Sequence, residues 1–403
     1  MKHLTISFFS IAVSAALPLL SSCGQQQAWD GGLISVQYDR LPQGEDILLS
    51  DWVGEPEFIA LDSSDPEALI DGGEITVSDR YIGIYSPRET LFKLFDRATG
   101  KFLRNIGNIG RGPGEYTGIS FAQIDETGGK IWISTLYTNN IYSYDISTGR
   151  LCEDLPLAYD GNGNPNQGYN FMVDSKARTV TIAGVPYDDS CPAAWCQDML
   201  GNVIWEIPKT GSVPVNAMLS LHTSLNVDGA LDICQWSMNT QQDTLFIIQD
   251  RELSPLLTIK LGETTEPNAL SLDDGDYMHD SFILPDYAVV NISKMKMVQS
   301  RNTGSGVSIS METDLQPAII LDRRTGEVSR RSIIDDILTN ESTGPTFKNG
   351  YLVSNCSAEY FIEAGPVFLE NGNLSSSARK RISDILKNIS EDDNNVIILA
   401  PLK

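Results

Sequence analysis

One short phrase recurs along the chain and constrains the fold more than any other feature: an aspartate ends an apolar strand, and a glycine closes a turn that leads into another strand. The phrase is clear at 96–100, 145–149 and 322–326, and it returns more loosely at Asp198 and Asp250. An aspartate side chain accepts hydrogen bonds from turn amides, and glycine adopts the positive φ that closes a hairpin. Each occurrence therefore predicts a β-hairpin.

The spacing of these hairpins predicts a β-propeller. The five aspartates are separated by 49, 53, 52 and 72 residues, and propeller blades repeat at roughly 40 to 50 residues. A second apolar pair precedes each hairpin, for example at 74–77 and 81–85, which gives four strands per blade. Dividing residues 30–370 by six gives about 57 residues per blade. We therefore expect an all-β, six-bladed propeller of four-stranded antiparallel blades, with a loop insertion around 302–305 in the long interval.

The period changes near the end of the sequence. Ile382, Ile385, Leu386 and Ile389 follow helical spacing after a run of serines at 375–377 that can cap a helix. We expect a short amphipathic helix at about 376–389. The apolar run at 396–399 then predicts a last strand, which should complete a blade together with N-terminal strand material and so hide open sheet edges.

The first residues form a secretion signal. A basic start precedes an apolar run at 4–20, and Leu20-Ser21-Ser22-Cys23 follows. The apolar run has 17 residues, fewer than the roughly 20 that a bilayer span needs, and the small residues before Cys23 form a lipobox. We expect a lipoprotein signal peptide at 1–22, lipid attachment at Cys23, a tether at 23–29 and the propeller at 30–403.

Charge and cysteine content limit the partners and the covalent structure. The formal net charge of −24 repels phosphate backbones, so we expect no nucleic acid partner. Beyond Cys23, an odd number of cysteines remains in an oxidising compartment. Two alternatives stay open: disulfides, with Cys191 and Cys196 as the nearest pair, or small buried thiols. The five cysteines are Cys152, Cys191, Cys196, Cys234 and Cys356.

Three segments of the sequence resemble a known protein family. The stretch FKLFDRATGKFLRNIGNIGRGPGEY within 91–116 resembles the six-bladed β-propeller lipoproteins of Bacteroides-type bacteria, which are related to the TolB-like and NHL-like propellers. The segments 48–62 and 390–395 resemble the two ends of that family. The resemblance implies the fold, and the lipobox predicts an outer-membrane lipoprotein. Residues 24–29 lack the early acidic run that resembles a surface-export signal in these bacteria, which favours the periplasmic face. The family resemblance implies no activity, because fold alone does not assign function.

The loop at 111–116, Arg-Gly-Pro-Gly-Glu-Tyr, is the first candidate site. Its glycines and proline suit a blade-to-blade crossover. The alternative places Arg111 and Glu115, with Tyr116, at the channel mouth, where a guanidinium and a carboxylate could hold a polar ligand. The order of a phosphate-binding loop is absent.

An acidic cluster is the second candidate. Asp273, Asp274 and Asp276 lie close to Asp280 and His279, and such carboxylates could bind calcium. The alternative is a charged surface loop. No other cofactor is expected.

Histidine is too scarce for most hydrolytic chemistry. Only His222 and His279 follow the signal segment, and no GxSxG elbow or HExxH helix occurs. We therefore favour a non-catalytic binding module, acting as a monomer, that presents one propeller face to a peptide, glycan or protein. The alternative is a divalent-cation-dependent hydrolase or lyase with its site in the central channel. Carboxylates or histidines around an ion in the channel would favour the enzyme.

Overall fold

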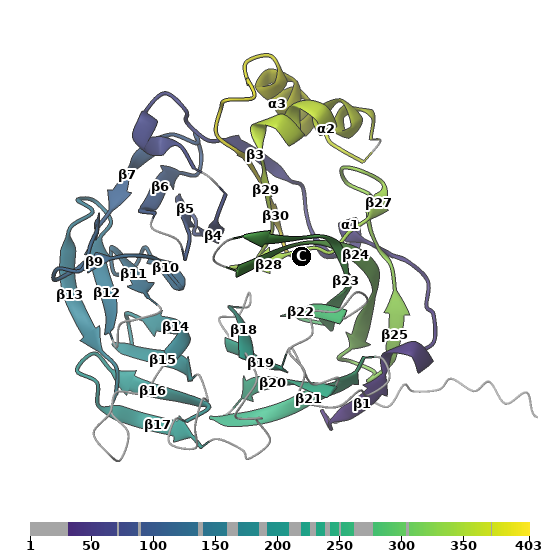
Figure 1. The fold of residues 1–403 in the computed structure, drawn as a ribbon, viewed down its shortest axis with the longest axis horizontal. Helices are drawn as coiled ribbons and strands as arrows, with labels where there is room; N and C mark the ends of the chain where they lie inside the picture. The colour runs from purple at the N-terminus through teal and green to yellow at the C-terminus, as the bar shows by residue number, and fades with distance from the viewer. Residues whose placement is uncertain are drawn as a thin grey trace, which may run out of the picture.

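The computed structural model shows an all-β ring of sheets around a central axis (Figure 1). It describes residues 31–70, 72–87, 90–135, 140–158, 168–184, 192–208, 219–225, 231–237, 242–249, 251–261, 277–303, 306–371 and 373–403. Within them, no helix is long and apolar enough to cross a membrane. The ring of four-stranded antiparallel sheets is the arrangement of a β-propeller.

Five of the sheets are built from four antiparallel strands that follow one another along the chain, with the first strand innermost in each. In chain order they are β4 (Glu74–Val77), β5 (Tyr81–Tyr85), β6 (Phe92–Asp96) and β7 (Phe102–Ile106); β10 (Phe121–Asp125), β11 (Lys130–Ser134), β12 (Asn140–Asp145) and β13 (Leu151–Pro156); β14 (Gly168–Asp174), β15 (Thr179–Gly184), β16 (Ala194–Asp198) and β17 (Val203–Ile207); β18 (Leu219–Leu225), β19 (Leu231–Ser237), β20 (Gln242–Gln249) and β21 (Glu252–Lys260); and β22 (Tyr277–Ile283), β23 (Tyr287–Thr303), β24 (Gly306–Asp322) and β25 (Val328–Arg331).

A sixth four-stranded sheet closes the ring with strands from both ends of the described chain. Its order is β28 (Phe347–Lys348), β29 (Tyr351–Cys356), β30 (Val396–Pro401) and β3 (Glu57–Ala60). Strands β3 and β30 pair antiparallel, with Phe58 opposite Ile398. The C-terminal strand thus joins N-terminal strand material, as the sequence predicted. This pairing covers an edge of β30 that would otherwise be open.

The number of sheets differs from the six blades expected. The described residues contain seven sheets of three or more strands, because a reduced sheet of three strands lies in addition to those with four or more. It consists of β2 (Ile47–Leu48), β26 (Ile333–Asp335) and β27 (Glu341–Ser342), and β2 pairs parallel with β26. This sheet lacks the repeated phrase, because β2 and β26 are far apart in sequence and too short to carry a pattern.

The predicted hairpins are confirmed where the structure describes them. The Asp96 carboxylate accepts a hydrogen bond from the Thr99 amide at 2.9 Å, and Gly100 has a φ of +74°. The turn after Asp145 repeats the arrangement, with Gly149 at +70°. Asp250 lies outside the described residues. The glycine conformation explains why the phrase recurs, since other residues rarely adopt it.

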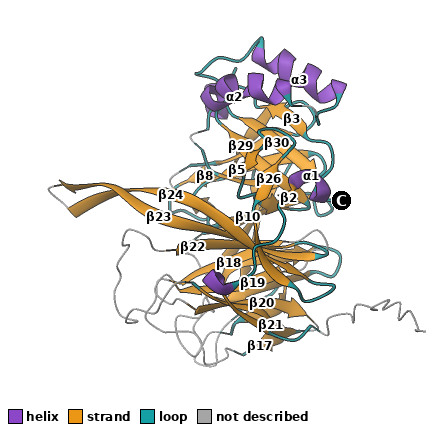
Figure 2. Cartoon of the chain, turned by 90° about the vertical axis from the view of Figure 1, so that its right-hand side faces the viewer, coloured by secondary structure: helices purple, strands orange, loops and turns teal. Residues whose placement is uncertain are grey.

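The long interval before Asp322 holds extended strands, and the loop insertion expected around 302–305 is therefore wrong. Strands β23 and β24 pair from Tyr287 opposite Asp322 to Thr303 opposite Gly306. They form a ribbon that projects from the ring (Figure 2). The strands of this ribbon lengthen far beyond those of the other sheets, so the extra residues add to an existing hairpin.

Two helices lie outside the closing sheet, where the sequence predicted one. Helix α3 (Ser376–Leu386) corresponds to the expected helix, is capped by Ser375 and ends three residues earlier. Helix α2 (Ala358–Glu370) was not predicted, and it contains Pro366, which interrupts the sequence pattern. The fully buried Phe361 and Ile382 belong to one apolar cluster with the closing sheet. The helices therefore cover that sheet and extend its core.

The segment before β3 runs along the outside of three sheets. Strand β1 (Ile34–Gln37) pairs parallel with β21, a bridge joins Gln43 to Arg330, and β2 joins β26. The short helix α1 (Leu49–Trp52) then leads toward β3. We call residues 34–56 the N-terminal strap. Further short elements are the 3-10 helices at Tyr38–Arg40 and Pro66–Ala68, and the parallel pair β8 (Asn108–Ile109) and β9 (Glu115–Tyr116).

The described cysteines are free thiols. Cys196, which the sequence left open as a partner for Cys191, is free and buried, as is Cys356. Burial raises the pKa of the Cys356 thiol to about 11, which keeps it protonated at neutral pH. Cys191 and the side chain of Cys234 lie outside the described residues. The interpretation as small buried thiols therefore holds for Cys196 and Cys356 and is wrong for Cys152, whose free thiol is exposed.

Candidate functional site

The loop at 111–116 connects two neighbouring sheets at the outer rim of the ring. Strand β8 precedes the loop and pairs with β9 at its end, and β9 lies beside β12 and β13, away from the axis (Figure 1). Glu115 accepts a hydrogen bond from the Gly112 amide at 2.8 Å, so its carboxylate stabilises the loop itself. The Arg111 side chain is exposed. Ligand binding by Arg111 and Glu115 stays a prediction. The loop lies at the outer rim of the ring, so such a site would not lie at the channel mouth that the sequence predicted.

Tyr116 has a structural role in this loop. Its side chain is buried, its hydroxyl donates to the Ile106 carbonyl, and it accepts from the Phe92 amide at 3.0 Å. Burial raises the pKa of this hydroxyl, so it stays protonated. The ring also meets Tyr144 edge to face, with centroids 6.1 Å apart. Tyr116 therefore fastens the crossover to the sheet it leaves and to the sheet it enters.

The other predicted site residues fall mostly outside the described part of the chain. Cys23 precedes it, and Asp273, Asp274 and Asp276 lie in a gap. Their neighbours His279 and Asp280 lie on β22. Among the described residues, no group of three or more His, Cys, Asp or Glu side chains is arranged to hold a metal ion. Calcium binding at the acidic cluster stays a prediction.

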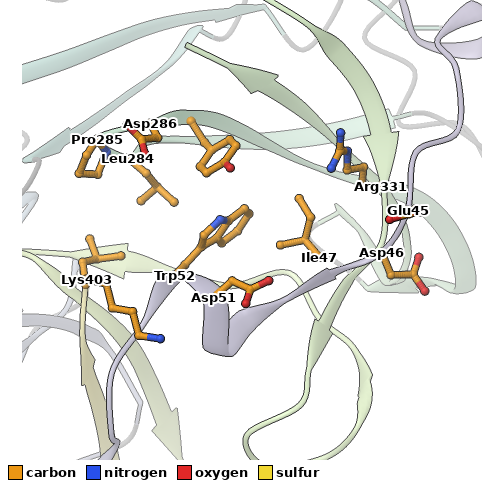
Figure 3. Close-up of a pocket in the computed structure, with 12 residues that line it drawn as sticks. Glu45, Asp46, Ile47, Asp51, Trp52, Leu284, Pro285, Asp286, Arg331 and Lys403 are labelled. Atoms are coloured by element: carbon orange, nitrogen blue, oxygen red, sulfur yellow. The ribbon is translucent and has the colours of Figure 1, made fainter. Parts of the chain in front are cut away.

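The structure instead shows a pocket that sequence reasoning missed. It lies where the N-terminal strap crosses between the β22–β25 sheet and the closing sheet, and its volume is about 370 Å³ (Figure 3). Figure 2 places α1, which carries part of the lining, on the side of the ring opposite the projecting ribbon. We call this pocket the seam pocket. Its lining residues are Glu45, Asp46, Ile47, Asp51, Trp52, Leu284, Pro285, Asp286, Tyr287, Arg331, Leu402 and Lys403.

Two aromatic rings form one wall of the seam pocket. Trp52 and Tyr287 lie with their centroids 5.6 Å apart and their planes tilted by 40°. Behind them, Phe347 meets Trp52 edge to face at 6.2 Å. Trp52 is 7% exposed and Tyr287 is half-buried. Because the rings are held by core contacts, this wall is rigid and can accept a flat or apolar part of a ligand.

Buried hydrogen bonds fix helix α1, which carries Trp52 and Asp51. The Asp336 carboxylate, which is 6% exposed, accepts from the Ser50 amide at 2.9 Å and from the Ser50 hydroxyl at 2.6 Å. The Asn373 side chain donates to the same carboxylate at 3.2 Å. From the other side, the Lys403 amide donates to the Trp52 carbonyl at 2.9 Å. The Trp52 side of the aromatic wall is thus positioned by residues from the C-terminal part of the chain.

Arg324, which is not part of the lining, contacts two lining residues of the pocket. Its guanidinium donates to the Tyr287 hydroxyl at 3.1 Å and lies 3.4 Å from the Asp286 carboxylate. It also stands 5.4 Å from the centroid of the Tyr287 ring. The Asp322 carboxylate, 2.7 Å away, is the main cause that raises the pKa of this guanidinium. Arg324 therefore holds Tyr287 and Asp286 in place at the rim.

Charges of both signs surround the opening. Four carboxylates and two cations line it, and Glu45, Asp46 and Asp51 are exposed and form no ion pair within the described residues. Arg331 donates instead to the Ser329 hydroxyl at 2.8 Å, and Lys403 donates to the Ser50 carbonyl at 2.6 Å. Such a lining can bind a polar ligand through charge-assisted hydrogen bonds.

Comparisons with known proteins place the fold. The family model described as a domain of unknown function, DUF4934, matches residues 34–401. No curated protein matches the chain. A predicted exported protein of Bacteroides fragilis, solved by crystallography, is 14% identical with a TM-score of 0.56, over 92% of this chain and 99% of that chain. At that identity the likeness shows a shared fold alone.

A second solved structure is similar over most of its length. It is a member of the DUF4221 family from Bacteroides vulgatus, 10% identical with a TM-score of 0.45, and the match covers 87% of this chain and 97% of that one.

Proposed function

The chain belongs to the DUF4934 family of domains of unknown function, and we propose that it is a membrane-anchored, non-catalytic binding module that holds a polar ligand in the seam pocket. The observation that carries this proposal is the rigid Trp52–Tyr287 wall beside carboxylates without ion pairs within the described residues. Binding sites commonly combine an apolar wall with a few polar groups that orient the ligand.

The anchor is proposed from the N-terminal sequence. The apolar run at 4–20 and the lipobox ending at Cys23 support lipid attachment at the outer membrane, with the periplasmic face favoured. The similar Bacteroides fragilis protein is described as exported, which agrees with secretion of this chain. A Cys23→Ala variant should move from the membrane fraction to the soluble fraction. Its retention in membranes would contradict the anchor.

The enzymatic alternative has no specific support in the described residues. A hydrolase or lyase would need a group that activates water, such as a metal ion or a general base. The seam pocket contains carboxylates, which can act as general bases, but its described lining has no histidine, cysteine or serine that could act as a nucleophile. Binding therefore accounts for the pocket with fewer requirements than catalysis.

The binding proposal can be tested with the mature chain and a library of amino acids, peptides and sugars. A ligand of the seam pocket should raise the melting temperature of the wild type, because it binds the folded state only. An Asp51→Lys variant should lose that shift, since the substitution places a long cation at the opening. An Asp392→Lys variant is the matched control, because Asp392 is exposed and lies outside the pocket.

The outcomes separate pocket binding from other effects. A shift that is present in the wild type and the Asp392 variant but absent in the Asp51 variant supports the proposal. Equal shifts in all three proteins, or the absence of any shift across the library, would contradict it. Mass spectrometry of the recovered ligand shows whether it was converted, which would instead support the enzyme.

A further inference from the structure

Two residues that line the seam pocket, Asp286 and Tyr287, already bind one cation of the chain itself. The Arg324 guanidinium contacts the Tyr287 hydroxyl and the Asp286 carboxylate and lies over the Tyr287 ring. This combination of a carboxylate, a phenol and an aromatic face is the chemistry that recognises guanidinium and ammonium groups. Arg324 therefore shows what kind of group these two side chains bind, although it does not itself line the pocket.

Carboxylates also border the pocket along the N-terminal strap, on the same side as Arg331. Asp51 lies beside Trp52, and Glu45 and Asp46 border the pocket farther along the strap, beyond Ile47 (Figure 3). They form no ion pair within the described residues. The two cations of the lining bind neutral oxygens, since Arg331 donates to Ser329 and Lys403 to the Ser50 carbonyl.

We infer that the ligand of the seam pocket carries an alkylammonium or guanidinium group, as a lysine or arginine side chain of a peptide does. The cation would meet the carboxylates of the strap, and the carbon chain attached to it would lie on the Trp52–Tyr287 wall. Arg331 and Lys403 would then face the carbonyl oxygens of the peptide. The inference rests on the proposed function and names its ligand class.

The electrostatic field of the whole chain supports a cationic ligand. The formal net charge is −24, so the protein attracts cations and repels anions at long range. Within the pocket, the four carboxylates exceed the two cations. An acidic or phosphorylated ligand would therefore meet unfavourable potentials both during approach and at the site.

The test uses the mature chain and three defined probes at low ionic strength. The first probe is acetyl-Gly-Lys-Gly-amide, the second replaces lysine by the neutral glutamine, and the third is the free polyamine spermidine. Isothermal titration calorimetry should show the lysine peptide binding at least about tenfold more tightly than the glutamine peptide, the ratio expected for one charge-assisted contact. Spermidine binding as tight as that of the lysine peptide would identify a free amine as the source of the cation.

Matched variants separate local recognition from the overall charge. The triple variant E45Q/D46N/D51N removes the strap carboxylates, and E391Q/D392N/D79N removes the same charge at exposed sites outside the pocket. The lysine peptide should bind the first variant about tenfold more weakly and the second with wild-type affinity. Equal weakening in both variants, or equal affinity for the lysine and glutamine peptides, would overturn the inference.

Failure of this inference is distinguishable from failure of the proposed function. Suppose that a neutral sugar or peptide binds the wild type but not the Asp51→Lys variant, while the lysine peptide and spermidine do not bind the wild type. The pocket then binds ligands but not cations. If no compound binds in a way that depends on Asp51, the pocket itself is refuted as the site.

Discussion

Removing one buried hydroxyl should measure how strongly the crossover at 111–116 stabilises the ring. In a Tyr116→Phe variant the ring and its contact with Tyr144 are kept, while the hydrogen bonds to the Phe92 amide and the Ile106 carbonyl are lost. Phe92 and Ile106 are both fully buried, so water cannot easily replace the hydroxyl. Each buried group left without a partner costs about 1–3 kcal/mol, and we expect a loss of about 2–4 kcal/mol in the free energy of unfolding.

The assay is urea unfolding of both proteins, followed by tryptophan fluorescence. A Tyr360→Phe variant is the control, because Tyr360 is 45% exposed on α2 and its hydroxyl is hydrated in the folded and unfolded states. The control should lie within about 0.5 kcal/mol of the wild type. If the free energy of unfolding of Tyr116→Phe also lies within about 0.5 kcal/mol of the wild type, the hydroxyl does not stabilise the crossover. A ligand-binding role for this loop would then be the better explanation of its sequence.

Three further predictions concern the hairpins and the closure of the ring. Gly100→Ala should destabilise the protein by at least about 1 kcal/mol more than Gly129→Ala in urea unfolding, because both glycines have positive φ but only at Gly100 would a Cβ collide with a carbonyl of β3. Hydroxyl and amide donors in the turn after Asp145 lower the pKa of its carboxylate. The stability that this carboxylate contributes is therefore present above the ordinary aspartate pKa of about 3.9, and it is lost as the pH falls through the lowered pKa of the folded state. An Asp145→Asn variant should therefore lose less stability than the wild type when unfolding midpoints at acid pH are compared with those at pH 6. In urea unfolding, Arg97→Met should lower the free energy of unfolding by about 2 kcal/mol, because Arg97 is buried. Glu57→Gln should lower it by less than about 1 kcal/mol, because the side chain of Glu57, which pairs with Arg97 at 2.9 Å, is half exposed.

The sequence predicted the features that depend on local chemistry. The Asp-to-Gly turns, with Gly100 and Gly149 at positive φ, require a particular residue at a particular position, so they leave a readable phrase. Helix α3 likewise carries its own cap and its own periodicity. The reduced sheet, by contrast, depends on two residues of β2 meeting β26. A two-residue pairing has no periodicity, and for that reason the sheet count could not be read from the repeat.

The candidate site could not be predicted for a related reason. Trp52, Tyr287 and Lys403 come from three distant segments, and each is an ordinary residue in its own neighbourhood. The sequence directed attention to 111–116 because glycine, proline and charge cluster there, but that composition serves the crossover held by Tyr116. Residues that a turn requires are conspicuous in a sequence, whereas residues that meet only in the folded ring are not.

The seam pocket and the closure of the ring depend on the same contacts. The strap that carries Asp51 and Trp52 continues into β3, which pairs with β30 in the closing sheet. The Asp336 carboxylate and the Lys403 amide hold α1 between them. A ligand in the pocket would touch the strap, the β22–β25 sheet and the last residues together, and it would bind only when all three are assembled. Binding should therefore stabilise the closed ring by linkage, and any change that loosens the strap should weaken binding without touching the ligand.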